Sequence, residues 1–342
     1  MPNLRTERLP KLSTGWTFSK VVAGLIAIVT SAAPGSAAAS EPQSIPAWLE
    51  AHVGDGDGQI TSVVLQRARA LYLRKVSEGA VNNPCYFAMD ATRPTSVGTD
   101  QLGRRFYTIC EASQTFKAVS AGFGSGRNLR GVVDFSNGRQ CARNFGNAQD
   151  ALLTTGGGYV TAETRTSFKG YYRSGLGKSV PFIRSFVQFD GEGDTANARV
   201  RAIGGHPAQV LKGMCRSKNS DSAYADEDGY VRMGKLVDYA GGRSNGCTSW
   251  SSSDARKIIP LMQDNPTTVY IYPERRDIEA VATAVKTGQP LARTGVYWNS
   301  ACLKAIRTPK FWQASTLEPL IARYNAAHPA QPAQELPICK QS

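Results

Sequence analysis

The sequence predicts a mainly β domain with a few flanking helices and with N- and C-terminal extensions. Two observations carry this prediction. From about residue 103, short segments rich in β-branched and aromatic residues recur, and glycine-rich turns separate them with little helical periodicity between. The expected strands are Arg105–Cys110, Phe116–Ser120, Gly131–Phe135, Tyr159–Thr164, Pro181–Phe189 and Arg199–Ile203.

A helix is expected before this region, because apolar residues recur at helical spacing over Ile60–Tyr72. The preceding stretch Asp55–Ile60 is similar to the middle of a calcium-binding loop. The two end positions of such a loop would fall on Val53 and Val64, which offer no oxygen ligand. We therefore predict a Gly/Asp turn that begins the helix, and no metal site.

The C-terminal third is expected to contain more helix. Ser251 and Asp254 fit a capping box, which predicts a helix from Asp254 to Asp264 that Pro260 should kink or shorten. One strand and two further helices are expected at Thr267–Tyr272, Ile278–Lys286 and Leu317–Ala327. We divide the chain into a signal peptide (1–39), a helical extension (40–102), a β-rich domain (103–276) and a C-terminal extension (277–342).

The first 39 residues have the pattern of an export signal. A positively charged start precedes an apolar run over Val21–Val29, and small residues follow, so cleavage is expected after Ala39. The run is shorter than the roughly 18 residues that span a bilayer, which argues against a membrane anchor. We expect a periplasmic or secreted protein without stable membrane insertion.

The cysteine count predicts one free thiol. Exported proteins keep disulfides, and seven cysteines give three pairs and one left over. We expect the pairs to form among Cys85, Cys110, Cys141, Cys215, Cys302 and Cys339, for which 15 connectivities are open.

The formal net charge of +13 indicates a cationic surface or attraction to a polyanion. The chain has no run of five Lys or Arg residues and no basic helix with interleaved aromatics, so no nucleic-acid partner is expected. We expect a monomer.

The leftover thiol is assigned to Cys247, which lies 41 positions after His206. A thiol among glycines and small polar residues, with a histidine elsewhere, is a candidate nucleophile. The N–H groups of Gly246 and Cys247 could stabilise an oxyanion, and Ser244 could orient the histidine ring. The alternatives are that Cys247 is disulfide-bonded and that His206 is a satisfied polar residue at a strand end.

Residues 197–250 resemble the catalytic domain of the L,D-transpeptidases of bacterial cell walls, in particular the branch with a long insert between His and Cys. That branch carries Asn-x-x-Ala-x-x-Arg-x-Ile-x-x-His before its insert. Residues 196–206 here read Ala-Asn-Ala-Arg-Val-Arg-Ala-Ile-Gly-Gly-His. The insert of that branch ends in Gly-Arg-Ser-x-Gly-Cys, as residues 242–247 do.

The resemblance implies a β-sandwich or β-barrel catalytic domain and a cysteine acyltransferase that needs no cofactor. Cys247 would attack the carbonyl of a diamino acid in a peptidoglycan stem peptide and expel a terminal D-alanine. His206 would transfer the proton, assisted by Ser244 and Gly246. The residues expected to contact the substrate are Arg243, Asn245, Gly205 and Arg201.

This chain departs from the common family pattern at three positions. Asn245 stands where many members have His, Ser249 where many have Arg, and Pro207 where Gly is usual. The missing arginine leaves the substrate carboxylate to another cation, for which Arg243, Arg201 and Lys178 are candidates.

Two further functions remain open. The same fold could hydrolyse the acyl-enzyme as an L,D-carboxypeptidase or endopeptidase, and the chain could be a catalytically silent envelope- or peptidoglycan-binding protein. A papain-like peptidase is disfavoured, because those chains place Cys before His.

Overall fold

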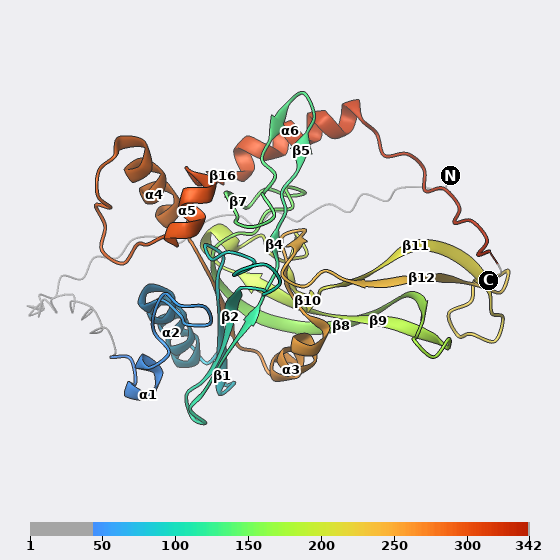
Figure 1. Cartoon of the computed structure of the whole chain (residues 1–342), viewed down its shortest axis with the longest axis horizontal. Coiled ribbons are helices and arrows are strands. Elements are labelled where there is room, and N and C mark those ends of the chain that lie inside the picture. Colours follow the sequence, from blue (N-terminus) through green and yellow to red (C-terminus); the bar gives the residue numbers. More distant parts are fainter. Residues whose placement is uncertain (1–43, 341–342) are drawn as a thin grey trace, which may run out of the picture. The chain divides into compact units, whose positions relative to one another are not determined.

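The computed structural model describes residues 44–340, so the expected export signal lies outside the described residues. From Ile45 onward the chain forms one compact unit (Figure 1). Within this part, no helix is long and apolar enough to cross a membrane.

A mixed sheet of ten strands dominates the fold, so the expected mainly β class with a few helices is confirmed. Eight strands follow the order β14-β10-β9-β8-β15-β1-β2-β3, and the β11–β12 hairpin joins them through β8. The bounds are β1 (Cys85–Asp90), β2 (Arg104–Cys110), β3 (Thr115–Ser120), β8 (Gly157–Arg173), β9 (Ser179–Gly191), β10 (Gly204–Pro207), β11 (Gln209–Lys218), β12 (Tyr230–Asp238), β14 (Thr248–Trp250) and β15 (Thr268–Tyr272).

Three short strand pairs and six α-helices complete the described part of the chain. The strand pairs are β4 (Phe123–Gly124) with β13 (Arg243–Ser244), β5 (Asn128–Leu129) with β6 (Val133–Asp134), and β7 (Asn144–Gly146) with β16 (Lys310–Trp312). The helices are α1 (Ala47–Glu50), α2 (Ser62–Ser77), α3 (Ser252–Met262), α4 (Arg275–Thr287), α5 (Ser300–Ile306) and α6 (Ala314–Ala327), with one 3₁₀ turn at Gly193–Thr195. The predicted cap of α3 is confirmed, since the Asp254 N–H donates to Ser251 Oγ at 3.0 Å.

The central strands bury both faces. In β1, Tyr86 and Ala88 point to one side and pack with α2, whereas Phe87 and Met89 point to the other side and pack with Trp250 and α3. Alternate residues of a strand face opposite sides, so one short segment serves two cores. Helices therefore lie on both sides of this part of the sheet (Figure 1).

Two long hairpins extend the sheet away from the helices. The β8–β9 and β11–β12 hairpins run side by side toward the far end of the molecule (Figure 1). The C-terminal segment after α6 returns to this hairpin pair, where the N–H of Cys339 donates to the carbonyl of Arg216 at 2.8 Å.

Several predicted elements differ from the structure. Arg199–Ile203 is not a strand but a turn, because Ala202 has a φ of +51° and the neighbouring strand is the short β10. Of Gly131–Phe135, only β6 is extended. Strand β1 pairs with β2 and β15 inside the sheet, so the sheet begins before the expected boundary at residue 103.

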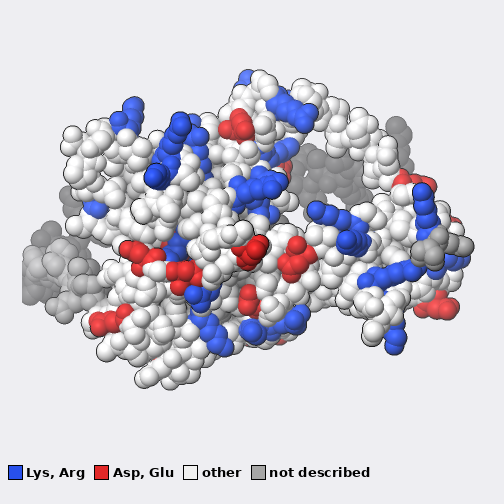
Figure 2. All heavy atoms as spheres, viewed as in Figure 1, with Lys and Arg blue, Asp and Glu red and all other residues white. Residues whose placement is uncertain are grey.

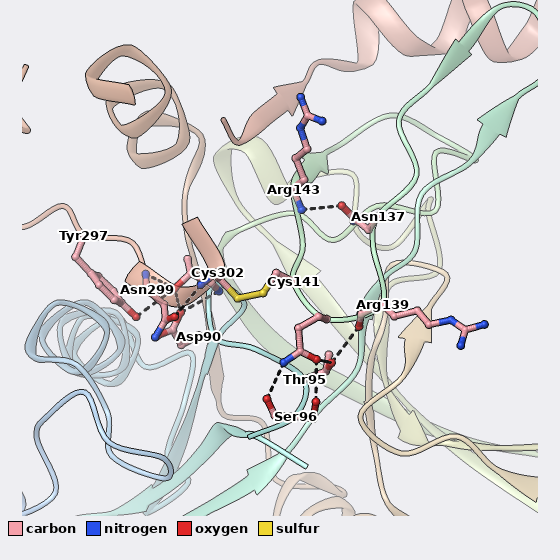
Figure 3. The surroundings of a disulfide bond; sticks show 12 residues. Asp90, Thr95, Ser96, Asn137, Arg139, Cys141, Arg143, Tyr297, Asn299 and Cys302 are labelled. Atoms are coloured by element: carbon pink, nitrogen blue, oxygen red, sulfur yellow. Dashed lines mark hydrogen bonds between the residues drawn. A yellow bond between two sulfur atoms is a disulfide. The ribbon is translucent and has the colours of Figure 1, made fainter. Parts of the chain in front are cut away.

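The three disulfides join Cys85 to Cys110, Cys141 to Cys302, and Cys215 to Cys339. The first lies within the β1–β2 pair, where the two cysteines are directly opposite. The second connects the loop before β7 to α5 (Figure 3). Beside it, the side-chain oxygen of Asn137 accepts a hydrogen bond from the backbone N–H of Arg143 at 2.9 Å, which fixes the loop that contains Cys141.

Charged side chains of both signs lie on the face of the molecule shown in Figure 2. On the face in Figure 2, Lys and Arg side chains are interspersed with Asp and Glu rather than gathered into one patch. This distribution is typical of a generally cationic surface.

Candidate functional site

The free thiol among the described residues belongs to Cys247, as the cysteine count predicts. Cys247 immediately precedes β14, which runs parallel to β10 with Ser249 opposite His206. The two motifs that the sequence separates by 41 residues are therefore carried by neighbouring strands.

The side chains of Cys247 and His206 lie on the same face of the sheet. Extending the parallel register by one position places Cys247 opposite Gly204, whose backbone N–H bonds to the thiol sulfur. Gly204 and His206 are two residues apart in β10 and thus share a face. Both candidate residues are nearly covered, with 9% of Cys247 and 4% of His206 exposed.

The turn before the thiol depends on a glycine. Gly246 has a φ of +108°, a region that side chains rarely adopt. A Cβ atom there would lie 2.8 Å from Ile203 Cδ1 and 3.1 Å from the carbonyl oxygen of Leu153. Both the backbone angle and the lack of space require Gly246 just before Cys247.

The ring of His206 is held in one tautomer. Its Nδ1 lies 2.8 Å from the carbonyl oxygen of Pro207, which can only accept, so Nδ1 carries the proton and Nε2 has a free lone pair. The ring of Phe186 stacks beside it at 6.5 Å between centroids. Nε2 is thereby ready to accept a proton.

Ser244 occupies a different role from the predicted one. Its hydroxyl donates to the carbonyl oxygen of Cys247, and its own carbonyl accepts the N–H of Ser125 at 2.6 Å. Pro207 therefore orients the histidine ring, and Ser244 instead fixes the turn that presents the thiol.

Both groups are held neutral near pH 7. Burial raises the pKa of the Cys247 thiol, and the Gly204 N–H and the charges of Arg184 and Arg201 only partly oppose it. Burial, together with the charge of Arg184, lowers the pKa of His206 to about 4. The resting pair is consequently thiol and imidazole rather than thiolate and imidazolium.

We expect the stability of the fold to depend on His206 in acid. The unfolded chain binds this proton from about pH 6.5 downward, whereas the folded chain binds it only near pH 4. Protonation thus favours the unfolded state in this window, and about 3 kcal/mol of unfolding free energy should be lost as the pH falls from 6.5 to 4. Urea unfolding at both pH values measures this loss, and the His206→Gln variant should lose correspondingly less. An equal loss in both proteins would contradict the assignment.

The predicted substrate residues are placed unequally. Arg243 in β13 and Asn245 just after it are exposed, and Arg243 Nη1 donates to the carbonyl oxygen of Asn137 at 3.0 Å. Gly205 lies on the opposite face of β10 from His206, where a Cβ atom would come within 2.2 Å of the Trp250 ring. Gly205 therefore permits close packing against Trp250, on the face of β10 that is turned away from the thiol.

Arg201 lies beside the thiol turn, but its guanidinium is already hydrogen-bonded to two neighbouring residues. Its guanidinium donates to Thr155 Oγ1 and to the carbonyl oxygen of Leu153, both at 2.6 Å. Its positive charge still acts on Cys247, whose thiolate form it favours.

Sequence reasoning missed two residues of the site, Arg184 and Phe186. They alternate in β9, the strand on the other side of β10. The strand itself was predicted, but only its pairing with β10 reveals that these two side chains share the face of His206. No sequence pattern specified that pairing.

Comparisons with protein-family models, with curated proteins and with solved structures found no match for this chain. Over residues 44–340, no group of three His, Cys, Asp or Glu side chains is arranged to hold a metal ion.

Proposed function

We propose that the protein is an exported cysteine acyltransferase of the L,D-transpeptidase type that acts on peptidoglycan stem peptides. The observation that carries this proposal is the free thiol of Cys247 on the same sheet face as the neutral imidazole of His206. The mixed sheet would then be the catalytic domain of that family. Three disulfides are typical of oxidising compartments, so we place the protein in the periplasm or outside the cell, with its signal removed.

The proposed reaction proceeds through a thioester. Cys247 Sγ attacks the carbonyl carbon of the diamino acid while its proton passes to His206 Nε2. The C–N bond to the terminal D-alanine breaks, and the same proton leaves with the amine of that residue. An amine of a second stem peptide, or water, then attacks the thioester and returns a proton to the thiolate.

The electrostatics of the pair suit this sequence of steps. A neutral imidazole can accept a proton, and the oxyanion can be stabilised by the N–H groups of Gly246 and Cys247, each worth roughly 3 kcal/mol when well placed. Because the resting thiol is protonated, thiolate formation should accompany attack on the bound substrate rather than precede it.

We expect the purified protein to release D-alanine from tetrapeptide muropeptides and the Cys247→Ala variant to release none. Intact-mass measurement should show an acyl adduct on the wild-type chain alone. The variant should keep the wild-type melting temperature, because the thiol makes only weak hydrogen bonds, with the carbonyl oxygen of Ala202 at 3.5 Å and with the backbone N–H of Gly204. Equal D-alanine release by a folded Cys247→Ala protein would refute the mechanism.

One observation favours the silent binding protein instead, namely that the resting thiol is both buried and protonated. The same experiment separates the two functions. A protein that sediments with insoluble peptidoglycan but forms no acyl adduct would be a binding module. An adduct resolved only by water would indicate a carboxypeptidase or endopeptidase.

A further inference from the structure

Arg184 lies on the face of the sheet that carries the thiol and the imidazole. Strands β9 and β10 are antiparallel, with Val187 opposite Gly205, so His206 falls opposite Phe186. The contact between the rings of Phe186 and His206 agrees with this register. Arg184 is two positions from Phe186 in the same strand and therefore points to the same side.

The guanidinium of Arg184 acts on three groups from three elements. Its positive charge adds to the burial that lowers the pKa of His206 in β10, and it opposes the burial that raises the pKa of Cys247 before β14 and of Tyr239 after β12. The side chain is half-buried, and within residues 44–340 no carboxylate forms an ion pair with it. A partly desolvated cation without an acidic partner attracts an anion from a ligand.

The other cations near the thiol are less suited to this task. Arg201 already donates to the Thr155 hydroxyl and to the carbonyl oxygen of Leu153, and Arg243 is exposed and bonded to Asn137. Lys178 lies in the turn at the far end of the β8–β9 hairpin.

The position two residues after the thiol offers no room for a cation. Ser249 is fully buried, and a Cβ atom on the neighbouring Gly122 would lie 2.3 Å from Ser249 Oγ. A long basic side chain would not fit there without displacing this loop. A cation that binds a ligand beside the thiol must therefore come from another strand.

We propose that Arg184 is the anion-binding residue of the site, and that it holds the acyl donor by the carboxylate next to the bond that Cys247 attacks. This inference rests on the proposed function and adds to it the residue that binds the donor. A guanidinium can grip a carboxylate with two parallel N–H bonds, so it fixes orientation as well as charge. Arg184 is thus a specificity-determining residue that positions the donor beside the thiol.

Binding to an inactive protein tests this assignment without any turnover. The Cys247→Ala protein is titrated at pH 7.5 with a stem tetrapeptide and with an analogue whose carboxylates on either side of the scissile amide are carboxamides. We expect the free carboxylates to bind about 10-fold tighter or more. In Cys247→Ala/Arg184→Gln this preference should vanish, while affinity for the carboxamide analogue stays unchanged.

Two further variants sharpen the test. Arg184→Lys keeps the charge but loses the paired donors, so it should restore only part of the preference. Lys286→Gln removes one exposed charge from α4 and should leave the preference intact. Equal binding of both peptides by Cys247→Ala, a preference that survives Arg184→Gln, or no binding of either peptide would overturn the inference. Acyl-adduct formation by the wild-type protein reports separately on the proposed function.

Discussion

Replacement of both Cys141 and Cys302 by alanine is expected to lower the free energy of unfolding by about 5 kcal/mol. The bond closes a loop between positions 161 residues apart, so its loss frees a large part of the unfolded chain. Both cysteines are buried, and α5, which carries Cys302, contributes to the main core. The loss is measured by urea unfolding of the double variant beside the wild-type protein.

The Cys215–Cys339 bond provides the control, with a similar separation of 124 residues. The segment from residue 329 to Cys339 is almost entirely exposed and has no helix or extended strand of its own. When this bond is removed, the segment can leave the sheet without uncovering the core, so the folded state gains freedom as well. We expect a much smaller loss, and an equal loss in the two double variants would contradict this account.

The second large effect is expected for Asp277→Asn, with a loss of about 3–5 kcal/mol in unfolding free energy. Asp277 is completely buried at the start of α4 and receives two hydrogen bonds from Arg67 of α2, at 2.6 and 2.8 Å. The neutral amide leaves the Arg67 guanidinium, which is only 19% exposed, with Glu274 at 3.5 Å as its remaining acidic partner, in place of the two short bonds to Asp277. Thermal and urea unfolding of the variant measure the loss.

Glu279→Gln serves as the matched change in the same helix. Glu279 is 56% exposed and pairs with Arg275 at 2.7 Å, an i,i+4 surface pair for which a loss below about 1 kcal/mol is expected. Similar losses for Asp277→Asn and Glu279→Gln would show that the buried pair does not anchor α2 to α4.

The free thiol could be predicted from the sequence, but the contacts around it could not. An odd cysteine count in an exported chain implies a free thiol, and the residues around Cys247 selected it. The pairings were not predictable, because they depend on register: Cys85 and Cys110 meet only because β1 and β2 align them. The role of Ser244 was missed for a related reason, since the Pro207 carbonyl that holds the ring has no side-chain signature.

The missed strands also have physical causes. β1 is buried at every position, so it shows no alternation of apolar and polar residues that could mark it as a strand. β10 contains two glycines and a proline, which have low strand propensity, and it is extended because β9 and β14 pair with it on both sides. The prediction Pro181–Phe189 covers most of β9, whereas Tyr159–Thr164 covers only the first part of the long β8.

The disulfides also determine what proteolytic cleavage of the chain would produce. The exposed stretch from Gly288 to Gly295 lies after α4, and both the Cys141–Cys302 and Cys215–Cys339 bonds connect the chain on its two sides. A protease that cleaved there would produce two fragments still joined by two covalent links. Such a nicked molecule would migrate as one species without reductant and as two with it. The strands that carry Cys247 and His206 would remain together on the larger fragment.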